Sequence, residues 1–294
     1  MRTVLSDARR GHAGLYVFAG AMVALSAATA VLLVLDQRTL LGAPLWAKPL
    51  KFAVSLGLYA GTLAWMLGRL DPGPDGRPPL RLTGWVLTLA GVLEIAIITG
   101  QAARGERSHF NVEEADDALL FRLMGVAIAA LYLATAAVAL RLLRGPAGPE
   151  RTAVRLGLLV SLLGMSVGWV MIVGGGHTVG AADGGPGLPL VGWSTAAGDL
   201  RVAHFVGLHA LQLLPLLVVA LRGVARLDDA ARRRIVLGAG AGYSALVVLL
   251  TVQALRAQPL LAPDALTLAG LVAVAVGTGA AVTPALRRRN AVAR

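Results

Sequence analysis

Glu94 is the residue whose type and position most strongly suggest chemistry. It lies within a run of about twenty apolar residues, where a carboxylate is costly and normally faces a bundle interior or a wet cavity. Gln101 follows seven residues later, so the two side chains share one stripe of a helix. We interpret Glu94 as a catalytic base or proton-binding group. The alternative is a protonated Glu94 that bonds a backbone carbonyl and holds helices together.

Histidines are the second group with chemical potential. His204 and His209 are five residues apart, whereas a same-face zinc pair on a helix uses a spacing of three or four. A haem tolerates this spacing because its two axial ligands can come from different helices. Zinc or copper held with a carboxylate is the other cofactor hypothesis, and for each histidine an interfacial hydrogen bond is the alternative. The predicted cofactor-binding residues are His109, His204, His209, Gln101 and Gln212, and the predicted metal ligands are His177, His204 and His209.

Charged residues near the same histidines complete the candidate site. Asp199 is a candidate catalytic base, and Arg201 a candidate clamp for a substrate carboxylate or phosphate. The alternative is that Asp199 caps the following helix and pairs with Arg201. Lys48 and Lys51, the two lysines of the chain, are candidate contacts for an anionic ligand, unless their ammonium groups only reach toward lipid headgroups.

The composition requires that these residues be carried by membrane helices. Hydrophobic residues make up 56% of the 294 residues, charged residues 15%, and the mean hydropathy is +0.72; an ordinary soluble domain is about 25% charged. Such a chain is neither soluble and globular nor disordered. The absence of cysteine excludes disulfides and thiolate chemistry. Eight apolar runs are long enough to span a bilayer: 15–35, 50–67, 82–103, 118–143, 156–176, 202–221, 235–255 and 265–285.

The distribution of basic residues predicts the orientation of this all-α helix bundle. With both termini cytoplasmic, nineteen of the 27 lysines and arginines fall on the inner side and eight on the outer side, as the positive-inside rule requires. The net charge of +11 therefore reports topology and gives no reason to expect a nucleic-acid partner. The predicted location is the bacterial cytoplasmic membrane, with lipid as the surrounding partner. His12 is expected to be a solvated tail residue, and the other four histidines lie at or near the outer face.

Two short motifs suggest an internal repeat within a single membrane domain covering residues 1–294. Gln101-Ala-Ala-Arg104 ends the third span, and Gln253-Ala-Leu-Arg256 ends the seventh. This pattern predicts two parallel four-helix halves, residues 14–144 and 155–286, of which the second lacks a counterpart of Glu94.

Several segments resemble a bacterial family of polytopic membrane proteins that is common in actinobacteria and whose activity is uncharacterised. They include Trp46-Ala-Lys-Pro-Leu-Lys-Phe52, Ser108-His-Phe-Asn111, Asp183-Gly-Gly-Pro-Gly187 and Gly198-Asp-Leu-Arg-Val-Ala-His-Phe205. The resemblance covers most of the chain and implies a multi-pass membrane protein, but it implies no activity. Haem A synthase is similar in architecture alone, since it also has eight helices in two halves.

Three functional hypotheses follow from the residues. The first is a membrane protein that binds haem b or a transition metal near the outer leaflet and is redox-active, with a quinone or small molecule as partner. The second is a proton-coupled transporter of a small solute, with Glu94, Gln101 and His209 as relay or binding groups. The third is an outward-facing hydrolase with Glu94 or Asp199 as base. If the third and sixth spans are neighbours, Glu94 and His209 are predicted to meet as a carboxylate–imidazole pair at membrane depth.

Overall fold

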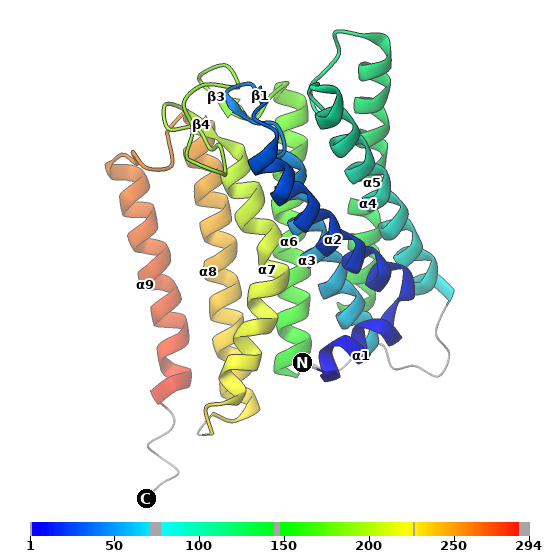
Figure 1. Cartoon of the computed structure of the whole chain (residues 1–294). Coiled ribbons are helices and arrows are strands. Elements are labelled where there is room, and N and C mark those ends of the chain that lie inside the picture. Colours follow the sequence, from blue (N-terminus) through cyan, green and yellow to red (C-terminus); the bar gives the residue numbers. More distant parts are fainter. Residues whose placement is uncertain (1, 71–77, 144–147, 226, 288–294) are drawn as a thin grey trace, which may run out of the picture. The chain divides into compact units, whose positions relative to one another are not determined.

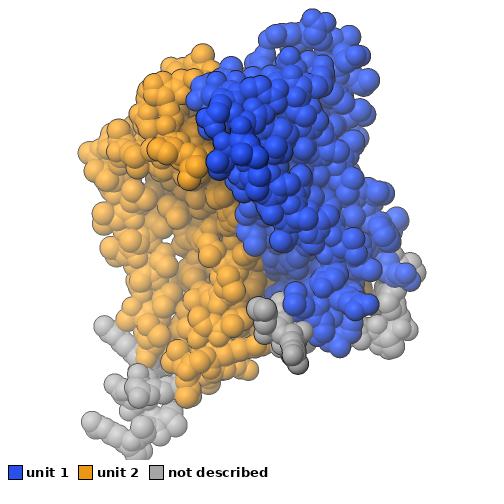
Figure 2. All heavy atoms as spheres, viewed as in Figure 1, with its two compact units in different colours: residues 1–138 blue, residues 139–294 orange. Residues whose placement is uncertain are grey.

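A computed structural model describes residues 2–70, 78–143, 148–225 and 227–287 of the chain. Within these residues, eight helices are long and apolar enough to cross a membrane, which confirms the predicted multi-pass helix bundle. The chain divides into two compact units, residues 1–138 and 139–294 (Figure 2). The break between the units falls within the last two turns of helix α5 (Ala115–Leu143), close to residue 144, where the first predicted half ends.

The described residues of the first unit form a short helix followed by four long ones, whose course can be followed in Figure 1. The short α1 contacts α3, and α3 also packs against α2 and α4. A short hairpin, in which the two-residue strands β1 and β2 pair, joins α2 to α3. The elements are α1 (Arg2–Gly11), α2 (Ala13–Leu35), β1 (Thr39–Leu40), β2 (Ala43–Pro44), α3 (Ala47–Leu70), α4 (Pro78–Arg104) and α5 (Ala115–Leu143).

One prediction about a histidine is wrong, because His12 is buried rather than solvated. Its side chain closes the N-terminus of α2: Nδ1 accepts a hydrogen bond from the Leu15 amide at 3.2 Å. Nε2 therefore carries the proton and donates to the Arg81 carbonyl at 3.1 Å. Burial lowers the pKa of His12, and the bond to Arg81 opposes this shift. The ring of His12 packs against α4, where it meets Trp85 edge-on at 5.3 Å and lies against Gly84. This long-range contact was not apparent from the sequence.

The second unit contains four long helices and one small two-stranded pairing. Its helices pack as α6 against α7, α7 and α6 against α8, and α8 against α9. The elements are α6 (Pro149–Gly174), β3 (Thr178–Val179), β4 (Gly198–Asp199), α7 (Leu200–Arg222), α8 (Asp229–Leu255) and α9 (Ala265–Arg287).

Glycine allows a close backbone contact between α6 and α7 in the second unit. Gly164 of α6 faces Gly207 of α7, and a Cβ placed on Gly207 would lie 2.5 Å from the Cα of Gly164. The two backbones thus touch directly, which is how small residues permit close packing between membrane helices. Buried Leu211 and Val160 fill the adjoining turns. This contact helps to position α7, the helix that carries four of the predicted site residues: Arg201, His204, His209 and Gln212.

Candidate functional site

Glu94 lies at the centre of a polar cluster within the first unit. Only 1% of its side chain is exposed, and no described residue donates a hydrogen bond to either carboxylate oxygen. The imidazole of His109 lies close by, with its Nε2 3.5 Å from Glu94 Oε1. A buried carboxylate with open oxygens is costly, so the group has unused capacity for a proton or a hydrogen-bond donor.

His109 connects this carboxylate to the loop between α4 and α5. Its Nδ1 lies 3.1 Å from Lys48 Nζ and 3.1 Å from Ser108 Oγ. A lysine ammonium can only donate hydrogen bonds, so Nδ1 accepts and Nε2 carries the ring proton. That proton points to Glu94. The side chain of His109 is 27% exposed, so the imidazole joins a buried acid to a more accessible position.

Aromatic side chains from three segments surround the imidazole. Phe52, Phe110 and Phe121 have ring centroids 5.8–6.4 Å from that of His109. Lys48 Nζ also lies 5.9 Å from the centre of the Phe52 ring, close enough for a cation–π contact. The cluster is thus enclosed by apolar surfaces, which strengthens the electrostatic interactions within it. Lys51 is partly buried one turn further along α3.

Gln101 does not share the cluster of Glu94 but holds the end of α4. Its Nε2 donates to Asp117 Oδ1 at 2.8 Å and to the Arg107 carbonyl at 3.3 Å. Arg104 donates to Gln101 Oε1 at 2.6 Å and to the same Asp117 oxygen, and Asn111 donates to the other oxygen at 2.9 Å. We call these residues the α4–α5 lock. The hydrogen bonds of Gln101 are used within this lock, so its predicted role in cofactor binding receives no support.

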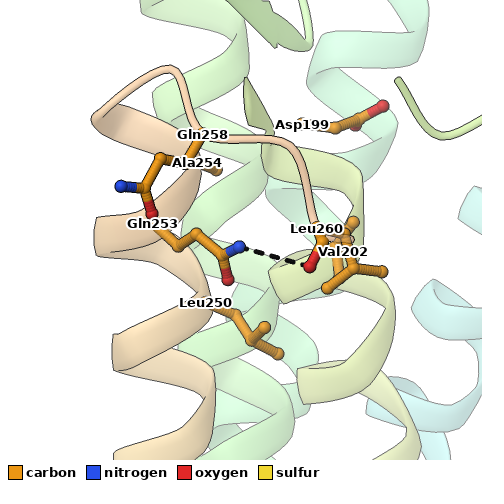
Figure 3. Close-up of a pocket in the computed structure, with 7 residues that line it drawn as sticks. All are labelled: Asp199, Val202, Leu250, Gln253, Ala254, Gln258 and Leu260. Carbon is orange, nitrogen blue, oxygen red and sulfur yellow. Dashed lines mark hydrogen bonds between the residues drawn. The ribbon is translucent and has the colours of Figure 1, made fainter. Parts of the chain in front are cut away.

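The second unit repeats this arrangement at the end of α8. Gln253 Nε2 donates to the Pro259 carbonyl at 2.9 Å and to the Leu260 carbonyl at 3.4 Å, the bond that Figure 3 shows. Arg256 forms an ion pair with Asp264 and also contacts Thr267 Oγ1. We call this group the α8–α9 lock.

The backbone geometry matches at one position of the two locks. The residue after the arginine has a positive φ in both locks, +83° at Gly105 and +58° at Ala257. A cavity of about 10 Å³ beside Gln253 has room for one water molecule and no larger ligand. Counting back seven residues from Gln253, as from Gln101 to Glu94, gives Leu246. The second unit therefore has a similar lock but no acidic residue at the position that corresponds to Glu94.

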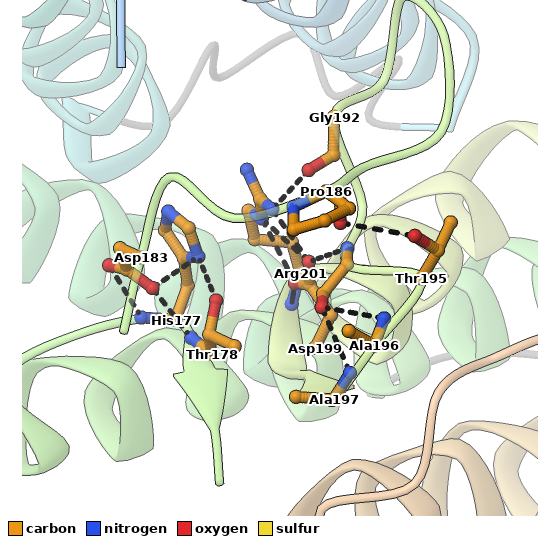
Figure 4. Close-up of polar contacts among 11 residues, drawn as sticks. His177, Thr178, Asp183, Pro186, Gly192, Thr195, Ala196, Ala197, Asp199 and Arg201 are labelled. Atoms are coloured by element: carbon orange, nitrogen blue, oxygen red, sulfur yellow. Dashed lines mark hydrogen bonds and ion pairs between the residues drawn. The ribbon is translucent and has the colours of Figure 1, made fainter. Parts of the chain in front are cut away.

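His177 forms a local pair in the loop that precedes α7 (Figure 4). Its Nδ1 lies 2.9 Å from Asp183 Oδ1, and the backbone amides of His177 and Thr178 donate to the Asp183 carboxylate at 3.3 and 2.9 Å. Burial alone would raise the pKa of Asp183, but the bonds from Thr178 and the charge of His177 hold that pKa below its ordinary value. Asp183 is a partner that the sequence did not reveal, although it follows His177 by only six residues.

Asp199 and Arg201 form the second polar group of Figure 4. Asp199 is the N-cap of α7, as the alternative interpretation predicted, and accepts from the Arg201 amide at 3.0 Å. Its other oxygen accepts from the Ser194 amide at 2.8 Å and from Arg201 Nη2 at 2.6 Å. Arg201 also donates to the Gly192 carbonyl. Both carboxylate oxygens are occupied, so the geometry favours the structural role over that of catalytic base.

The remaining histidines lie on α7 and have separate partners. His204 Nδ1 donates to the Gly164 carbonyl at 2.8 Å. His209 Nδ1 lies 3.4 Å from Gln212 Oε1, and its ring meets Phe205 edge-on at 4.4 Å. Among the described residues no three histidine or acidic side chains are grouped as a metal site would require. His177, His204 and His209 are all described, so the predicted metal set does not converge.

The structure thus brings together Glu94, His109 and Lys48, three of the predicted site residues, and leaves the others in structural contacts. The predicted encounter of Glu94 with His209 joins two different units and stays a prediction, whereas the contact with His109 lies within one unit. Sequence reasoning named His109 without linking it to Glu94, because a loop residue has no helical register that fixes its depth. The chain matches no family model, no curated protein and no solved structure.

Proposed function

We propose that this multi-spanning membrane protein is a proton-coupled carrier of a small solute, in which Glu94 binds the coupled proton. The observation that carries the proposal is a buried carboxylate that receives no hydrogen bond from any described residue and has an imidazole nitrogen 3.5 Å away. Ionisable groups inside a membrane domain are rare and commonly form proton relays.

The arrangement of Lys48, His109 and Glu94 supports a direction for proton movement. The imidazole has one nitrogen toward the lysine and the other toward the acid, so a proton accepted at Nδ1 releases another from Nε2 to the carboxylate. Neutralising Glu94 removes the unfavourable burial of its charge. Occupation by a proton thereby changes the electrostatics of the helices around it, which is the property a coupled carrier needs.

Proteoliposomes with a pH-sensitive dye inside test the proposal. A proton gradient is imposed from the side that carries the loop 105–114, and amino acids, organic carboxylates, sugars and organic ammonium ions are added separately. We expect one class to accelerate acidification of the interior. Glu94→Gln should abolish the solute-dependent proton flux while still exchanging solute across the membrane, and His109→Ala should slow the flux by about tenfold or more.

Glu106→Gln is the matched control, because Glu106 is an exposed acid in the same loop and should transport as the wild type does. The proposal fails if none of the four solute classes moves protons, or if Glu94→Gln couples protons as well as the wild type.

A further inference from the structure

The loop that carries His109 is held against the helices on both sides of this histidine. On one side, Gln101 of α4 donates from Nε2 to the Arg107 carbonyl at 3.3 Å. On the other side, Asn111 donates from Nδ2 to Asp117 Oδ2 on α5 at 2.9 Å. Asn111 is only 2% exposed, so its amide exchanges water for this bond. The α4–α5 lock therefore holds the chain both before and after His109.

Asp117 is the residue that joins the two attachments. Its side chain is buried, and one carboxylate oxygen accepts from Asn111. The other oxygen accepts from Gln101 Nε2 and from Arg104 Nη1, each at 2.8 Å. Hydrogen bonds to an ionised carboxylate are stronger than those between neutral groups. Because Gln101 also bonds the loop backbone, a displacement of Asp117 would loosen both attachments.

The backbone between His109 and Asn111 has an unusual conformation. Phe110 has a φ of +56°, in the left-handed region that a bulky residue rarely adopts. Such a conformation persists only where the surrounding structure determines it. At this turn, two side chains that are two positions apart reach different helices: His109 approaches Glu94 of α4, and Asn111 bonds Asp117 of α5.

We propose that Asp117 is a positioning residue that holds the imidazole of His109 beside Glu94 by way of Asn111. The proposal rests on the proposed function, in which this imidazole passes a proton to Glu94. Proton transfer needs heavy atoms within hydrogen-bond reach, about 2.6–3.2 Å. The 3.5 Å between His109 Nε2 and Glu94 Oε1 lies just beyond that reach. A small movement of the loop toward α4 would complete the bond, and a movement away would prevent the transfer.

An exchange of the two bonded side chains tests the role of Asp117. Asn111→Asp keeps the size of the side chain but places a second carboxylate against Asp117, and two adjacent carboxylates disfavour each other's charge. The double variant N111D/D117N restores the bond in the reverse direction. The new amide at position 117 donates to the new carboxylate at position 111, and its oxygen still accepts from Gln101 and Arg104.

Nitrogen NMR of the full-length protein in detergent, labelled with isotope-enriched histidine, reports the contact of His109 with Glu94. The chain has five histidines, and the signal that disappears in His109→Gln assigns this residue. In the wild type, Glu94→Gln should shift the ring-nitrogen signals of His109. Asn111→Asp should lower this response about twofold or more, because groups in one hydrogen-bond network are energetically coupled. N111D/D117N should restore the response.

The proteoliposome assay gives the second measurement. The solute-dependent proton flux should fall about tenfold in Asn111→Asp, as in His109→Ala, and should recover in N111D/D117N. Asp116→Asn is the matched control, because it removes an exposed acid next to Asp117. This variant should have the wild-type flux and the wild-type response of His109.

The two measurements separate this inference from the proposed function. The positioning role is overturned if Asn111→Asp leaves the response of His109 unchanged, if N111D/D117N does not restore it, or if Asp116→Asn lowers it as much. The proposed function can stand in each of these cases. The expected NMR responses in a protein that couples no solute to protons would support the positioning of His109 and reject the proposed transport.

Discussion

At the scale of single residues, two buried carboxylates illustrate opposite uses of the same group. Asp199 is 2% exposed and has donors at both oxygens, so its charge stabilises the start of α7. Glu94 is 1% exposed and has none among the described residues. The two side chains are almost equally buried. Glu94, the candidate functional acid, differs from Asp199 because no described residue donates a hydrogen bond to it.

The pair of Asp183 and His177 gives a prediction about pH. The pKa of Asp183 is lowered in the folded protein, so its contribution is present above the ordinary aspartate pKa and is lost as the pH falls through the lowered value. Asp183→Asn should increase opening of the His177 and Thr178 amides about tenfold at neutral pH. Hydrogen exchange, corrected for the intrinsic rate, measures this opening.

The wild-type exchange should approach that of the variant as the pH falls below about 3.9. Asp116→Asn, which changes an exposed acid of the first unit, should leave these amides unaffected. Protection of the two amides that is constant through the titration of Asp183 would contradict the assigned role of this carboxylate.

Particular residues show how far the sequence predicts the site. Glu94 was identifiable because a charge within an apolar run is rare, and Asp199 because a cap directly precedes a helix. The contact between Glu94 and His109 was not identifiable from the sequence, because it depends on how the loop that carries His109 folds back toward the helices. His12 was misjudged for the related reason that burial near a terminus depends on packing with distant residues.

At the scale of elements, the sequence located all eight spans to within several residues at each end, because hydropathy alone defines a membrane helix. The Gln-x-x-Arg motif was also visible in the sequence, but its role in joining consecutive helices was not. In the structure it ties the end of α4 to the start of α5, and the end of α8 to the start of α9. The matching contacts favour the predicted internal repeat, which stays a prediction.

The contact between α6 and α7 gives a prediction at the same scale. Gly207→Ala would place a methyl group against the backbone of Gly164, so we expect a loss of about 1–3 kcal/mol in the free energy of unfolding. Gly277→Ala on α9 is the comparison, because nothing lies within 4 Å of its added Cβ. That variant should be neutral or stabilised by up to about 1 kcal/mol.

Denaturation of the purified variants in detergent measures both effects. Equal stability of the two alanine variants would show that the close approach of α6 and α7 does not determine the packing of the second unit.

At the scale of the whole molecule, an even number of candidate spans among the described residues predicts that both ends of the chain lie on the same side of the membrane. The charge asymmetry of the loops predicts that this side is the cytoplasm. With this orientation, the loop between α4 and α5 that carries His109 is predicted to face the outer side.

Cysteine labelling checks the predicted orientation, and the chain itself has no cysteine to give background. Glu106→Cys should react with a membrane-impermeant maleimide in intact cells. Arg234→Cys should react only after the membrane is permeabilised. Both positions are exposed, so a reversed pattern would mean that the topology is inverted.

The two locks also bear on the order in which the protein is made. All the hydrogen bonds of the α4–α5 lock connect residues no more than sixteen positions apart, and those of the α8–α9 lock connect residues within eleven. Each lock can close as soon as the second helix of its pair begins to leave the ribosome. Each pair of spans can thus enter the membrane as a preformed hairpin, before the helices that will enclose it have been synthesised or rearranged around it.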